Sequence, residues 1–183
     1  MIVQIKKLAQ KIKIKSPDLL TRPIGRAMYE EIKKDLSVIK DEEVVILDFL
    51  DIRVIDSSFI DEFIIKLLDD TKHTDKKFYI KLRNISGIGQ TNISSVFRSY
   101  SDYDDKKMVV MTEDICLNNN FFIGEMSDLE KDIINYFRVN RIASIHDIRS
   151  VTGLSAEETG NILRRLNNLR IIRANDSDSY AVV

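Results

Sequence analysis

Two kinds of hydrophobic pattern alternate along the first 115 residues of the chain. One is the short, continuous apolar run of a strand covered on both faces, and the other is the spacing of an amphipathic helix, with charged residues between apolar ones. These patterns predict helices at 27–36, 59–68 and 93–100, and strands at 43–49, 77–82 and 107–112. Because strands that alternate with helices form parallel pairs, we predict an α/β domain with a mixed, largely parallel sheet and covering helices.

The segments between these elements carry turn and edge signals. Residues 1–15 alternate lysine with apolar residues in part, so we expect an opening strand or hairpin whose lysines protect a sheet edge. Residues 16–26 hold both prolines and are expected to form a loop. Gly87 and Gly89 form an isolated G-x-G, which favours a turn in a loop at 86–92 over a phosphate-binding loop.

The pattern changes in the last third of the chain. Residues 118–126 contain three asparagines and a glycine and are predicted to be a linker after a first domain at 1–117. Residues 127–183 then show three helices, the first with a capping box at Ser127, followed by two short strands. This order is the layout of a winged helix-turn-helix, so we predict a small C-terminal α+β domain of that type at 127–183.

Composition narrows the classes of function. The net charge of −1 provides no overall field that would attract nucleic acid or an anionic membrane. Cys116 is the single cysteine, and His73 and His146 have no cysteine at metal-ligand spacing, so we expect no disulfide, metal site or cofactor. No apolar run has signal-peptide or transmembrane character, and a cytoplasmic protein that does not bind membranes is expected.

The stretch V54-I-D-S-S-F59 places Asp56, Ser57 and Ser58 where a strand should give way to a helix. The first turn of a helix has free backbone N–H groups and partial positive charge, which suits a capping side chain or a phosphate. The serines are therefore caps or a phosphorylation switch, and both interpretations stay open. A catalytic nucleophile is not expected, because no G-x-S-x-G elbow surrounds the serines and neither histidine has a triad context.

Two motifs, R22-P-I-G-R26 and D56-S-S-F-I-D-E62, occur in that order with the apolar strand 44–49 between them. Over about residues 1–115, the chain resembles a STAS domain, the fold of bacterial anti-sigma-factor antagonists. It resembles more closely the STAS-like domains of unknown function that carry these two motifs. This resemblance implies a domain that binds a protein partner, and the expected partner is a kinase-like regulator.

The resemblance also bears on the serine pair. In anti-sigma-factor antagonists the first serine after the aspartate is phosphorylated, which points to Ser57, with Asp56 and Ser58 beside it, as the switch. A glycine commonly follows the two serines in those proteins, whereas Phe59 stands here. The STAS-like family shares that phenylalanine, and phosphorylation of its members does not follow from the resemblance.

In a winged helix-turn-helix, the third helix is expected to lie in the major groove of DNA. The predicted contact residues are Ser155, Asn161, Arg164, Arg165, Asn168 and Arg173. Residues 127–183 hold eight basic and eight acidic residues, whereas a domain that depends on counterion release usually has a basic excess. Binding of double-stranded DNA and a role in protein binding or dimerisation therefore both stay open for this domain.

The sequence thus predicts a non-enzymatic transcriptional regulator with a protein partner at the first domain and double-stranded DNA at the second. The alternative is a protein-interaction adaptor that does not bind DNA. A small-molecule ligand has no signature in the sequence. The identity of the partner, the DNA site and the oligomeric state, a homodimer included, are left open.

Overall fold

The computed structural model describes the whole chain except residues 74–75, 114–121 and 176–177. The described residues divide into two compact units, Met1–Gly124 and Glu125–Val183. The predicted end of the first domain at residue 117, Cys116, Asp176 and the predicted linker residues 118–121 lie outside the described residues.

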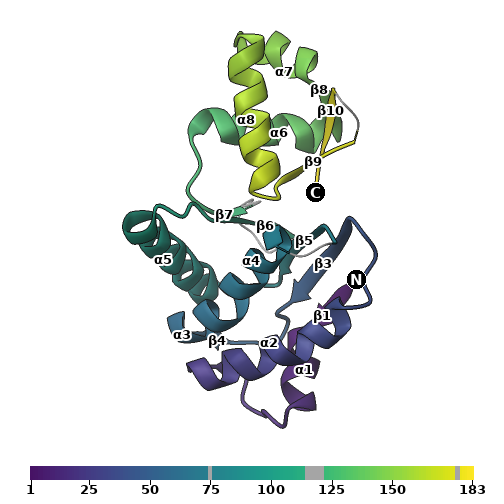
Figure 1. Ribbon diagram of the computed structural model, residues 1–183. Helices are drawn as coiled ribbons and strands as arrows, with labels where there is room; N and C mark the ends of the chain where they lie inside the picture. The colour runs from purple at the N-terminus through teal and green to yellow at the C-terminus, as the bar shows by residue number, and fades with distance from the viewer. Residues whose placement is uncertain (74–75, 114–121, 176–177) are drawn as a thin grey trace. The chain divides into compact units, whose positions relative to one another are not determined.

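A five-stranded sheet in the order β1-β3-β5-β6-β7 runs through the first unit (Figure 1). The first four strands are parallel, and β7 is antiparallel to β6. The strands are β1 Ile2–Gln4, β3 Glu43–Asp48, β5 Phe78–Arg83, β6 Val109–Glu113 and β7 Phe122–Gly124. This mixed, largely parallel sheet confirms the α/β class predicted from the alternating hydrophobic pattern.

Helices surround this sheet and bury one apolar side each. They are α1 Ile5–Lys11, α2 Arg22–Leu36, α3 Ser57–Ile60, the π-helical turn η1 Asp61–Ile65, α4 Lys66–His73 and α5 Gly87–Asp104. Met28 and Ile32 of α2 pack in the core with Phe59 and Phe63, whose ring centroids lie 5.2 Å apart. The segment α3–η1–α4 is therefore the central packing element of the helical layer, and α3 contacts both α2 and α5 (Figure 1).

Several predicted elements of the first unit were wrong in their bounds. The N-terminal segment does begin with the predicted strand, β1, but it continues into the helix α1 and not into a hairpin, because Ile5, Leu8 and Ala9 form a buried helical stripe. The helix α2 starts at Arg22 and takes in the predicted loop residues, since a proline is accommodated in the first helical turn. The predicted loop at 86–92 is the start of α5, where Ser86 accepts a hydrogen bond from the backbone N–H of Gly89.

The predicted linker at 118–126 also needs correction. Its residues Phe122–Gly124 form β7, the edge strand of the first sheet, paired with β6. Gly124 has a φ of 128°, and a side chain there would meet the carbonyl oxygen of Met108 at 2.3 Å. A glycine at this position is thus what allows the edge strand to pair so closely.

The second unit contains three helices and a three-stranded antiparallel sheet in the order β8-β10-β9 (Figure 1). These elements are α6 Asp128–Asn140, β8 Ile142–Ser144, α7 Ile145–Thr152, α8 Ala156–Asn168, β9 Ile172–Ala174 and β10 Ser179–Val182. The capping box predicted at Ser127 is present, and Ser144 and Ser155 begin the other two helices in the same way. The short strand β8 was not predicted. None of the helices in the described parts of the chain combines the length and apolar character that a membrane crossing needs.

Candidate functional site

The serine pair lies next to two short parallel strands, each of which is followed by a helix. The strand β2 (Asp18–Leu19) pairs with β4 (Val54–Ile55), and they lead into α2 and α3. Asp56 joins the two helix starts, because its Oδ1 accepts from the backbone N–H of Phe59 at 2.7 Å and its Oδ2 from that of Thr21 at 3.0 Å. Asp56 is therefore the cap of α3 and also fixes the approach of α2.

Neither serine hydroxyl provides this cap. Ser57 is the first residue of α3 and is exposed, and Ser58 is half-buried. The backbone N–H of Asp61 donates to the carbonyl oxygen of Ser57, so these two residues lie one helical turn apart on the same face. Ser57 is thus exposed to solvent one helical turn before Asp61.

Two acidic residues follow in the π-helical turn and bind basic side chains of α2 and α4. Asp61 accepts hydrogen bonds from Arg22 and from the hydroxyl of Tyr100. Glu62, whose side chain is only 7% exposed, accepts from Nη2 of Arg26 at 3.1 Å, from Nη1 of Arg22 at 3.2 Å and from the ammonium of Lys66. We call Arg22, Arg26, Asp61, Glu62 and Lys66 the ion-pair cluster.

Ion pairs and burial shift the pKa of Glu62 in the cluster and of the neighbouring Tyr100. Hydrogen bonds from Arg26 and Lys66 lower the pKa of Glu62 to about 2, against the opposing effect of burial. Burial, followed by the hydrogen bond to Asp61, raises the pKa of Tyr100 to about 12. At neutral pH, Glu62 is therefore a carboxylate and Tyr100 a neutral donor.

Gly25 allows α2 to approach the turn closely enough for these contacts. A Cβ atom on Gly25 would lie 2.9 Å from Cβ of Glu62 and 3.0 Å from the carbonyl oxygen of Phe59. Real Cβ atoms do not approach other atoms this closely, so the helix crossing requires glycine. The motifs R22-P-I-G-R26 and D56-S-S-F-I-D-E62 are thus two halves of one packed structure.

The segment from Gly25 through the second motif is similar to a known family. Residues 25–90 match a STAS-like domain of unknown function (DUF4325). The match includes Gly25, Arg26 and the whole second motif, and it confirms the predicted resemblance for this segment. It does not extend to Arg22 or to the second unit. A comparison of the chain with curated proteins found no match.

The ion-pair cluster was not among the predicted site residues, although four of its members stand within the two quoted motifs and Lys66 lies four residues after the second. One motif contributes two arginines and the other an adjacent pair of acids. This complementary charge is the signal that could have paired them. Periodicity could not show it, because 36 residues separate Arg26 from Glu62.

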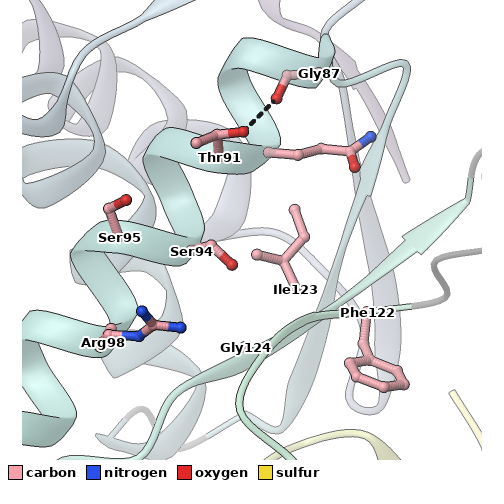
Figure 2. Close-up of a pocket in the computed structure, with 9 residues that line it drawn as sticks. Gly87, Thr91, Ser94, Ser95, Arg98, Phe122, Ile123 and Gly124 are labelled. Carbon is pink, nitrogen blue, oxygen red and sulfur yellow. Dashed lines mark hydrogen bonds between the residues drawn. The ribbon is translucent and has the colours of Figure 1, made fainter.

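A hollow of about 560 Å³ lies between α5 and β7 (Figure 2). Side chains with hydroxyl groups on one side of α5, Thr91, Ser94 and Ser95, line it together with Arg98. Gly87 at its upper end is in the first turn of α5, and its carbonyl oxygen accepts a hydrogen bond from Thr91 at 3.0 Å (Figure 2). The glycine pair predicted to form a turn is therefore a helix start.

The residues predicted to contact DNA lie on β9, on α8 or at its N-cap, and they differ in how many contacts they already make within the protein. Ser155 is occupied by the capping box of α8, and Arg165 pairs with the fully buried Glu130 of α6 at 2.8 Å. Arg164 is exposed and donates to the side-chain oxygen of Asn161.

The two remaining predicted contacts lie farther along the same elements. Asn168, at the end of α8, is exposed, and Arg173 of β9 is half-buried. The structure thus joins the exposed Asn161 and Arg164 by a hydrogen bond and assigns structural contacts to Ser155 and Arg165.

Proposed function

We propose that the chain is a non-enzymatic regulator in which the STAS-like domain binds a protein partner and is switched by phosphorylation of Ser57. The observation that carries this proposal is that the cap of α3 and the exposed hydroxyl at its start belong to two different residues. Asp56 makes the capping hydrogen bonds, while Ser57 presents its hydroxyl to solvent. A residue with no role in the cap and an exposed hydroxyl is open to modification without loss of the helix start.

The chemistry requires a kinase-like partner and a nucleoside triphosphate. The Oγ of Ser57 forms a bond to the γ-phosphorus, and the bond between that phosphorus and the bridging oxygen breaks. A nucleoside diphosphate leaves, and a base on the partner takes the hydroxyl proton. The product carries nearly two negative charges at neutral pH beside Asp56 and Asp61, a change large enough to alter a protein interface.

The second unit is proposed to be a winged helix that binds double-stranded DNA. Its order of three helices and a closing hairpin, with β8 completing the sheet, supports this interpretation. The outer face of α8 offers Asn161 and Arg164, whose amide and guanidinium groups suit contacts with bases and phosphates. Signals received by the STAS-like domain would then be passed to transcription.

Binding to a generic duplex, measured by fluorescence anisotropy at several salt concentrations, tests this part. Arg164→Gln should weaken binding and reduce the slope of log K against log salt by about 1. Lys40→Gln, which removes the same charge from an exposed site in the first unit, should leave both unchanged. Absence of binding by the wild type at low salt would overturn the DNA-binding proposal.

A second candidate is an adaptor whose second unit binds protein instead of DNA. A groove of about 610 Å³ runs along α6 and α7, and Val139 and Val151 beside it are 82% and 57% exposed. Such exposed apolar side chains are typical of protein-binding surfaces. Val139→Asp should abolish partner capture or dimerisation if this candidate is correct, and should leave DNA binding unchanged if it is not.

The partner proposed for the STAS-like domain is tested with purified host kinase fractions and three baits: wild type, Ser57→Ala and Ser57→Asp. Wild type and Ser57→Ala should retain the same partner, and Ser57→Asp should change its affinity at least several-fold. Equal retention by all three baits would contradict a charge-sensitive switch at this position.

A further inference from the structure

We propose that Arg22 is the internal receptor for the phosphoryl group on Ser57, and that phosphorylation draws Arg22 away from Asp61 and Glu62. The inference rests on the proposed phosphorylation of Ser57 and specifies how the modified side chain acts on the fold. Its effect would be to loosen the contact between the first turn of α2 and the π-helical turn.

Contacts on both sides of Ser57 locate Arg22. The residue before Arg22, Thr21, donates its backbone N–H to Asp56, which directly precedes Ser57. Arg22 itself donates to Asp61, which lies one turn after Ser57 on the same face. The start of α2 therefore runs past Ser57, and the guanidinium of Arg22 already binds the residue beside which a phosphate on Ser57 would sit.

The charges favour transfer of Arg22 to the phosphate. A phosphoryl group on Ser57 adds nearly two negative charges one turn from the carboxylate of Asp61, and like charges at this spacing repel. A guanidinium can form two parallel, charge-assisted hydrogen bonds with phosphate oxygens, and these are stronger than hydrogen bonds between neutral groups. The side chain of Arg22 is 57% exposed, so it can reorient without leaving a hole in the core.

Arg22 is also the cation that the ion-pair cluster can release most readily. Without Arg22, Glu62 keeps Arg26 and Lys66, and Asp61 keeps the hydroxyl of Tyr100. Neither acid loses its last partner. Arg26, in contrast, donates from both Nε and Nη2 to the nearly buried Glu62, so its release would be more costly.

Arg53 is the competing receptor near this end of α3. It directly precedes β4 and is held by Asp18 of β2, to which its Nε donates at 2.9 Å. Arg53 is 70% exposed and belongs to a different ion pair. An experiment that separates Arg22 from Arg53 and Arg26 therefore tests the assignment.

The test uses full-length protein carrying phosphoserine introduced at position 57 during translation, so that no kinase is needed. A ³¹P NMR titration reports the second ionisation of the phosphate, whose ordinary pKa is about 6. The nearby Asp56 and Asp61 raise this pKa, so a value lowered by about 1 unit shows a bound cation. Arg22→Gln should remove the lowering, whereas Arg26→Gln and Arg53→Gln should retain it.

Arg22→Lys keeps the positive charge but removes the planar guanidinium that binds phosphate in a bidentate manner. This variant should show about half of the decrease in the phosphate pKa. An unchanged titration in Arg22→Gln, or loss of the lowering in Arg53→Gln instead, would overturn the assignment. These results do not depend on whether the host phosphorylates Ser57. Failure of the proposed switch would show as absence of the modification in native protein, and failure of this inference as an Arg22-independent titration.

Discussion

Replacement of Gly25 by alanine tests whether the two sequence motifs are one packed unit. The new Cβ atom would lie 2.9 Å from Cβ of Glu62, 3.0 Å from the carbonyl oxygen of Phe59 and 3.2 Å from its Cα. Two of these three atoms belong to the backbone, and the third is attached to it directly. The clash therefore cannot be relieved by a rotamer change, and α2 must move away from the π-helical turn.

The magnitude follows from two opposing effects. Overpacking of a tight contact costs about 1–3 kcal/mol, while alanine in place of glycine inside a helix stabilises by up to about 1 kcal/mol. We expect Gly25→Ala to lower the free energy of unfolding of the first unit by about 1–2 kcal/mol. For a unit of this size, that corresponds to a fall in melting temperature of roughly 4–8 °C.

The assay is urea unfolding followed by far-ultraviolet circular dichroism and tyrosine fluorescence, because the chain has no tryptophan. Gly87→Ala is the matched control, since a Cβ atom on Gly87 meets nothing within 4 Å. It should change stability by less than about 0.5 kcal/mol. If Gly25→Ala is as stable as Gly87→Ala or more so, the close approach between α2 and the turn is not what holds the motifs together.

Three further changes test other contacts. The lowered pKa of Glu62 means that its stabilising effect is complete above the unfolded value of about 4.5 and is lost as pH falls towards 2. Glu62→Gln should therefore flatten the dependence of urea midpoint on pH between 5 and 3, and an unchanged slope would refute this. Arg165→Ala removes the ion-pair partner of the buried Glu130 and should destabilise the second unit by about 1–2 kcal/mol, a value kept low because half of the arginine is exposed. Thermal unfolding measures this change, and an unchanged stability would mean that Arg165 is not needed for the fold and is available to contact DNA. Asp56→Ala should cost about 1 kcal/mol through loss of the cap, whereas Ser57→Ala should be nearly neutral in the same assay, and the reverse order would move the cap to the serine.

Much of the fold was predictable because it depends on local hydrophobic spacing. The strand β3 is built on a continuous apolar run, β5 and β6 are mostly apolar, and α2, α4 and α6 show one apolar face each. The helix α1 was not predicted, because the alternation of lysine and isoleucine after Lys11 favours a strand and the helical spacing of Ile5 and Leu8 extends over only two turns. The strand β7 was missed because three residues give no period, and it exists through pairing with β6.

The candidate site was predictable only in part, for a related physical reason. The role of an aspartate or serine at the start of α3 follows from local chemistry, and the structure places it on Asp56. The ion pairs of Arg22 and Arg26 with Asp61 and Glu62 join residues about 40 positions apart, so they depend on the packing of α2. No local pattern contains that packing. Only the opposite charges of the two motifs indicate it.

The central claim, that Ser57 is a regulatory phosphorylation site, is tested most directly by intact-mass analysis of protein purified from its native host. The account predicts a fraction of wild-type molecules with one added phosphoryl group under at least one signalling condition, and none in Ser57→Ala under the same condition. Ser58→Ala should retain the adduct. Native protein that stays unmodified under every condition, or an adduct that persists in Ser57→Ala, would contradict the claim.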